Sequence, residues 1–263
     1  MRYEWGGKYL RKYLGRVTKM YIAWSVLTLP ITFLIIERAH GDYPLYLKAV
    51  YLVRLFLFTG SIGIYWYVLA LIYNSVIIYF SFKKKADHWL YVFAFLFWII
   101  GTLYNSPYNN GNALFESIHV IFGSERNFLN VGLFYMSIGY FFAKHECKGN
   151  VWVLIFLFLM SIVARSLEVE YLHTNTLQAL EAVLLFMIGI NVRFNQLEKY
   201  SLSIRKLSTA IYLEHFPFIL LFDWYLTKGT ALDFNVTLVF SVLAYFILMR
   251  LLPDKAVKML YGN

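Results

Sequence analysis

Long apolar runs, separated by short polar or basic segments, dominate the pattern of residues along this chain. Most runs are close to the ~20 residues that an α-helix needs to cross a bilayer. We therefore predict an all-α fold, a polytopic integral membrane bundle of about eight transmembrane helices. The predicted spans cover residues 20–36, 61–82, 88–104, 127–143, 151–167, 174–192, 207–227 and 234–252.

Two flanking segments complete a single predicted membrane-embedded domain over residues 1–263. The first 19 residues carry basic side chains on one side of a helix and tyrosines on another, which predicts a basic interfacial helix. Such a helix either anchors the chain to anionic lipid or offers a phosphate-binding edge. Residues 253–263 are predicted to be a cytoplasmic tail. The shared basic side is made of Lys8, Lys12, Arg16 and Lys19.

One apolar stretch, residues 45–58, is not predicted to cross the membrane. It holds Lys48 and Arg54 and follows a turn at Gly41 and Pro44. Charged side chains are costly inside a membrane. A short re-entrant or surface helix therefore fits this stretch better than a full span.

Composition and charge agree with a membrane protein. Of 263 residues, 60% are hydrophobic and 15% charged, whereas about a quarter of a soluble domain is charged. With the N-terminus inside, 18 of the 24 lysines and arginines fall on predicted inner segments. The positive-inside rule then predicts that both termini are cytoplasmic. The net charge of +9 thus reflects topology, and we predict no nucleic-acid partner.

The most polar of the predicted spans contains the leading candidate site. At 100° per residue, Ser208, Tyr212 and His215 share one stripe of a helix, while Glu214 points away from it. Pro217 cannot donate a hydrogen bond to the carbonyl four residues earlier, so it loosens the helix beside His215. Such a stripe either lines a site or bonds to neighbouring helices.

Other ionisable residues are weaker catalytic candidates. Glu116 and His119, three residues apart, form either an acid–base pair or a surface loop pair. Glu181 lies inside a predicted span, where it either serves a site or pairs with Arg165 or Arg126. The sequence contains no nucleotide-binding, metal-binding or nucleophile-elbow motif. We predict no metal and no bound cofactor.

Four segments, in order along the chain, resemble the acyltransferase type 3 family of integral membrane acyltransferases. Residues 9–24 resemble a basic stretch entering a span, with Arg16 and Lys19 at the positions of an Arg-x-x-Arg pattern. Residues 65–71 resemble Leu-Trp-Phe-Leu-x-Ala-Leu, and residues 207–217 resemble Leu-Ser-x-x-Ile-Tyr-Leu-x-His-x-Pro. Residues 126–143 are similar to a Phe-Phe-x-x-Gly-Tyr span.

The resemblance implies a function. Such a protein moves an acyl group, often acetyl, from cytoplasmic acyl-CoA to a hydroxyl of a cell-envelope glycan or lipid. It implies a bacterial cell membrane as the location and acyl-CoA as the co-substrate. Arg16 and Lys19 would contact the acyl donor, and His215 matches the family motif. The residues expected to line the site are Ser208, Tyr212, Trp66 and Arg126.

The chain also departs from the family pattern. The family has two further spans ahead of the segment that matches Arg16, and they carry the histidine taken to be catalytic. That motif has no match here. We therefore expect either an acyltransferase that is truncated or inactive, or a non-catalytic permease or lipid- or amino-acid-handling module with the same fold. Helix faces left uncovered would favour association with another membrane chain.

Overall fold

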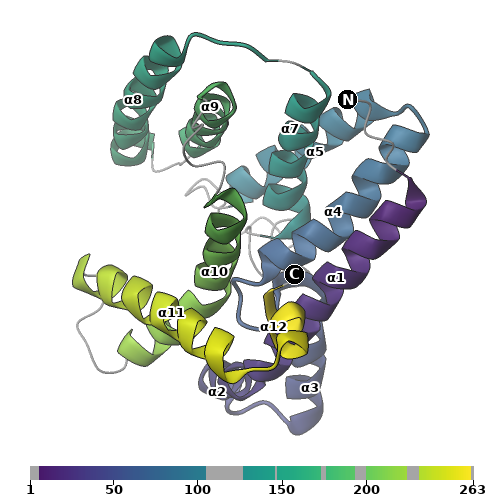
Figure 1. Ribbon diagram of the computed structural model, residues 1–263, viewed down its shortest axis with the longest axis vertical. Coiled ribbons are helices and arrows are strands. Elements are labelled where there is room, and N and C mark those ends of the chain that lie inside the picture. Colours follow the sequence, from purple (N-terminus) through teal and green to yellow (C-terminus); the bar gives the residue numbers. More distant parts are fainter. Residues whose placement is uncertain are drawn as a thin grey trace. The chain divides into compact units, whose positions relative to one another are not determined.

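Every element of the described chain is helical in the computed structural model (Figure 1). The structure describes residues 6–104, 127–145, 147–172, 176–192, 200–223 and 231–261. The helices are α1 (Gly7–Leu27), α2 (Leu29–His40), α3 (Leu45–Arg54), α4 (Trp66–Lys83), α5 (Asp87–Tyr104), α7 (Leu133–Lys144), α8 (Val151–Leu167), α9 (Leu177–Asn191), α10 (Ser201–Asp223), α11 (Ala231–Leu251) and α12 (Asp254–Tyr261). Three π-helical turns accompany them: η1 (Leu55–Thr59), η2 (Phe128–Gly132) and η3 (Glu168–Leu172).

Within the described ranges, three helices are long and apolar enough to cross a membrane: α4, α5, and α8 together with the start of η3. The bent pair of α1 and α2 brings the number to four if it counts as one span. The all-helical class predicted from sequence is confirmed for the described residues, and the three apolar helices fit a membrane location. The other predicted spans are shorter or more polar; α9, for example, has 15 residues.

The chain divides into two units. Unit 1 contains residues 1–72 and 197–263, and unit 2 contains residues 73–196. The first turns of α4 belong to unit 1 and the rest of that helix to unit 2. Each unit is described separately below.

The N-terminal segment of unit 1 differs from the sequence-based expectation. α1 runs without a break from the basic residues into the apolar ones, so residues 7–19 are not a separate interfacial helix. No glycine or proline lies between Gly15 and Pro30, so no helix-breaking residue interrupts α1 near Lys19. The break comes later, where α2 begins at an angle of 60° to α1. Pro30, in the first turn of α2, cannot donate to the carbonyl of Val26, which explains the position of the bend.

The C-terminal segment, predicted as a cytoplasmic tail, is helical in the structure. After Pro253 the chain forms α12, whose Val257, Leu260 and Tyr261 are buried while its lysines face outward. The indole Nε1 of Trp24 donates to the carbonyl of Leu260 at 2.7 Å. This bond satisfies one of the carbonyl groups that the end of a helix leaves unpaired. α12 is therefore a packed part of unit 1.

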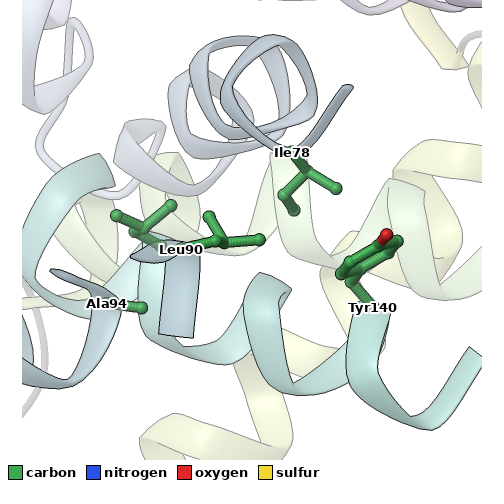
Figure 2. Close-up of a cluster of buried hydrophobic side chains, with 5 residues drawn as sticks. Ile78, Leu90, Ala94 and Tyr140 are labelled. Carbon is green, nitrogen blue, oxygen red and sulfur yellow. The ribbon is translucent and has the colours of Figure 1, made fainter. Parts of the chain in front are cut away.

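The core of unit 2 forms where α4, α5 and α7 meet. Its apolar side chains come from all three helices, as Figure 2 shows for four of them. At one end of this core, Asp87 accepts hydrogen bonds from Tyr140, at 3.2 Å, and from Lys144. The bond to Asp87 raises the pKa of Lys144. The buried members of the core are Ile78, Leu90, Ala94, Leu133 and Tyr140.

A glycine allows a close helix approach in unit 2. A Cβ atom added to Gly101 of α5 would lie 2.8 Å from the Cβ of Asn130 in η2. Gly139 and Ala143 of α7 are also small residues four positions apart, a spacing that lets helices approach closely. A Cβ at Gly139, however, would meet no described atom within 4 Å, so the close approach lies at Gly101.

We expect Gly101→Ala and Gly139→Ala to have opposite effects on stability. At Gly101 the added methyl group forces η2 away from α5, which should cost about 1–2 kcal/mol of unfolding free energy. At Gly139 the same change only reduces the conformational entropy that the backbone loses on folding. It should therefore stabilise the protein by about 0.5–1 kcal/mol. Denaturation of both variants in the same detergent measures the difference. Equal effects would contradict the close approach of η2 to α5.

Candidate functional site

The candidate site of unit 1 forms where residues 64–67, at the start of α4, meet the middle of α10. The hydroxyl of Tyr65 donates to the carbonyl of Leu213 at 3.1 Å. The hydroxyl of Tyr212 donates in the other direction, to the carbonyl of Ile64. These reciprocal bonds join positions that lie 148 residues apart in the sequence.

Pro217 explains why the Leu213 carbonyl needs the tyrosine. A residue at position 217 would normally donate its backbone N–H to that carbonyl, and proline has none. Tyr65 supplies the missing donor, as neighbouring side chains often do beside a proline within a helix. α10 therefore continues through Pro217 to Asp223, and the predicted local weakness is repaired by a contact with α4.

Aromatic rings connect this contact to His215. The ring centroids of Trp66 and Tyr67 lie 6.1 Å apart, and those of Tyr67 and Tyr212 lie 5.4 Å apart. The centroid of the Tyr212 ring lies 5.9 Å from that of the His215 imidazole. Three of the residues predicted to form the site are therefore brought together: Trp66, Tyr212 and His215. We call Trp66, Tyr67, Tyr212 and His215 the aromatic–histidine cluster.

The hydrogen bond of His215 defines which of its nitrogens can act as a base. Its Nδ1 lies 3.0 Å from the carbonyl oxygen of Ile211, one turn earlier in α10. A carbonyl oxygen only accepts, so this bond places the proton of the neutral ring on Nδ1. Nε2 then keeps its lone pair, and no hydrogen bond engages it within the described part of the chain. The half-buried imidazole is thus arranged to accept a proton at Nε2.

Glu214 is the residue that sequence reasoning missed. It points away from His215, as predicted, but its side chain is buried, with 3% of the residue exposed. One carboxylate oxygen accepts a hydrogen bond from the hydroxyl of Tyr261 in α12, while Oε2 has no partner in the described part of the chain. Burial and the contact with Glu214 raise the pKa of Tyr261, which stays protonated and donates. The only sequence signal for this site was an acidic residue within an apolar run.

A series of buried hydroxyl groups continues from the same region. Tyr65 contacts Thr28, which lies between α1 and α2, and the hydroxyl of Thr28 lies 3.3 Å from that of Ser61. Ser61 in turn donates to Ser25 at 3.4 Å. Polar groups buried in this way bond to one another, and here they join α1 to the turn before α4.

The predicted acyl-donor residues are exposed on α1 and lie outside this cluster. The guanidinium group of Arg16 lies 5.7 Å from the centre of the Tyr13 ring, one turn earlier. Lys19 is exposed, as is Ser208 of α10, which was expected to line the site. In the described chain, none of these three side chains contacts the aromatic–histidine cluster. They remain available to a ligand in solution.

Glu181 of unit 2 is held by an ion pair. Its carboxylate accepts a hydrogen bond from Nε of Arg165 at 2.8 Å, which links α9 to α8. This is one of the two pairings that the sequence suggested as the alternative to a catalytic role. The other candidates from that part of the sequence, Glu116, His119 and Arg126, lie outside the described residues.

Comparison with known proteins adds no relative. No protein-family model, curated protein or solved structure matches the chain. Among the residues that the structure describes, no group of three or more His, Cys, Asp or Glu side chains is placed to hold a metal ion. The proposals below therefore rest on the residues of the chain itself.

Proposed function

We propose that this protein is a membrane-bound acyltransferase that moves an acyl group, most simply acetyl, from cytoplasmic acyl-CoA to a hydroxyl of a cell-envelope glycan or lipid. In this proposal His215 is the general base. Its Nε2 removes the proton of the acceptor hydroxyl as the oxygen attacks the thioester carbonyl, and the CoA thiolate leaves.

The observation that carries this proposal is the orientation of His215. Its bond to the Ile211 carbonyl leaves Nε2 as the acceptor, and the ring of Tyr212 holds one side of the imidazole. Tyr212 is itself fixed by its hydrogen bond to the Ile64 carbonyl. The two segments that meet here, residues 65–71 and 207–217, are two of the four that resemble the acyltransferase type 3 family. Their contact gives the resemblance a common location in unit 1.

The proposal includes a topology. Eight spans with both termini in the cytoplasm would place the basic face of α1 on the inner side of a bacterial cell membrane. There the exposed Arg16 and Lys19 would attract the phosphates of acyl-CoA. The exposed apolar side chains of α8, such as Trp152 and Phe156, suit contact with lipid.

A second candidate is a non-catalytic permease or a module that handles a lipid or an amino acid. The observation that favours it is the sequence pattern, because no segment of this chain matches the family motif that carries the catalytic histidine. In that case His215 would be a binding or structural residue, and its replacement would change ligand affinity without any chemistry to lose.

Acetyl transfer in membranes distinguishes the two candidates. Membranes that contain the chain are given acetyl-CoA labelled in the acetyl group, and the label in envelope glycan and lipid is counted. The acyltransferase proposal predicts label above that of membranes without the chain, together with equal release of free CoA thiol. A folded chain that transfers no label supports the second candidate and overturns the first.

Acyl-CoA binding should depend on the basic residues of α1. The double change Arg16→Ala and Lys19→Ala removes two charges that would each contact phosphate, so we expect at least about tenfold weaker binding, since charge-assisted bonds are the stronger ones. Calorimetry with acetyl-CoA and the purified protein measures this. The change Lys83→Ala and Lys84→Ala, on exposed positions at the end of α4, is the matched control for charge alone. Equal weakening by both pairs would contradict a specific donor site.

A further inference from the structure

The proposed reaction uses neither Glu214 nor α12, the helix that packs over it. α12 packs over the buried carboxyl group of Glu214, which belongs to α10 of unit 1. Tyr261 reaches it from the last turn of α12, and the ring of Tyr261 packs against Trp24 at 6.2 Å and Tyr245 at 5.3 Å. The end of a helix of only eight residues thus seals the group.

α12 is held by hydrogen bonds at its last turn and by the buried side chains of Val257, Leu260 and Tyr261. One hydrogen bond comes from Trp24 of α1 to the Leu260 carbonyl, and one goes from Tyr261 to Glu214 of α10. Pro253 separates α12 from α11, so α12 can move without unwinding that long helix. The polar face of α12, with Lys255 and Lys258, is exposed and would be equally solvated if the helix were released.

The docked state also leaves one polar group unsatisfied. Oε2 of Glu214 is buried and has no hydrogen-bond partner among the residues that the structure describes. An unpaired buried acceptor destabilises the arrangement that encloses it, and water would hydrate this oxygen once α12 moved away. Docking of α12 therefore includes an unfavourable free-energy contribution from the unpaired oxygen, which favours release of the helix.

We propose that α12 is a lid over Glu214, which seals this carboxyl group from water when docked and admits water-borne reactants to it when released. Tyr65, the first of the buried hydroxyl groups described above, interacts electrostatically with the same carboxyl group and bonds to the backbone of Leu213, the residue before Glu214. Opening the lid would therefore connect a polar track inside unit 1 to the solvent.

Chemical modification of Glu214 measures the lid directly. The purified full-length chain is treated with a water-soluble carbodiimide and glycine ethyl ester. The carbodiimide activates a carboxyl group, the amine displaces the resulting urea, and an amide forms. Mass spectrometry of peptides then follows Glu214 beside the exposed Glu170, which is an internal reference. We expect Glu214 to react at least about tenfold more slowly than Glu170, because it reacts only through local opening.

Two variants should release the lid from different sides. Tyr261→Phe removes the bond to Glu214, and Trp24→Phe removes the bond to the Leu260 carbonyl. Each should speed modification of Glu214 about tenfold, the effect of losing one such bond, with Glu170 unchanged. Tyr245→Phe is the matched control, because it removes a neighbouring hydroxyl that bonds to neither group, and it should leave the rate unchanged.

A second measurement separates lid opening from general loosening. Ala210 of α10 lies one turn before Glu214 and is fully buried. A cysteine at position 210, with Cys147→Ser, should react faster with a soluble thiol reagent when Tyr261→Phe is added. A cysteine at Ala94, in the core of unit 2, should not. Parent Glu214 that reacts as fast as Glu170 would overturn the proposal. So would equal rates in the parent and both lid variants, or equal acceleration at positions 94 and 210.

Discussion

Replacement of His215 with alanine should lower the rate of acyl transfer by at least about a hundredfold, the usual contribution of a positioned general base. The expectation follows from Nε2, which the Nδ1 bond to the Ile211 carbonyl leaves free to accept a proton. Binding of acetyl-CoA should change little, since the basic residues of α1 lie outside the aromatic–histidine cluster. The ratio of rates, measured with labelled acetyl-CoA at saturating donor, tests this.

The matched control is Ser208→Ala, two turns earlier on α10 and exposed. It should retain most of the parent activity, although the sequence pattern placed Ser208 on the same stripe as His215. If His215→Ala keeps full activity in a folded chain, the proposed base is wrong. If both changes remove activity equally, the effect arises from α10 as a whole.

Replacement of Gly60 with alanine should destabilise the protein by about 3 kcal/mol or more. Two causes act together. Gly60 has φ of +83°, a conformation that side chains disfavour, and an added Cβ would lie 2.6 Å from the backbone carbon of Tyr65. Relief of that overlap would displace Tyr65, and with it the hydrogen bond to Leu213. The thermal midpoint in detergent should fall accordingly.

Gly63→Ala separates the two causes. Gly63 has a similar φ of +78°, but an added Cβ meets nothing within 4 Å. Only the backbone term remains, so we expect a loss of about 1 kcal/mol. Equal losses at both positions would show that the turn before α4 does not pack closely against Tyr65.

The sequence predicted the helices well where a continuous apolar run defines them. Residues 88–104 were predicted as a span, and α5 covers Asp87–Tyr104, because a continuous apolar run has no competing signal within it. Residues 45–58 were predicted as a short helix, and α3 with η1 covers Leu45–Thr59. The bend between α1 and α2 was less apparent, since Pro30 lies inside an otherwise uniform apolar run.

The contacts of the site did not follow from the sequence. Periodicity placed Tyr212 and His215 on one stripe, and the structure brings them together with Trp66. Periodicity could not show that Tyr65 replaces the donor that Pro217 lacks, because that bond joins residues far apart in the sequence. Tyr261 was missed for the same reason. Its segment was predicted as a cytoplasmic tail, and its partner Glu214 lies in a different helix.

The central claim is that residues 64–67 pack against α10 and thereby orient His215. A cysteine pair at Tyr67 and Tyr212, whose rings lie 5.4 Å apart, tests it in a chain with Cys147→Ser and a short bifunctional thiol reagent. The control pairs Tyr67 with Ile204, which is exposed on α10 and about 12 Å away along the helix axis from Tyr212. We predict rapid cross-linking of positions 67 and 212 and little of 67 and 204. Equal yields, or none for 67 and 212, would contradict the claim.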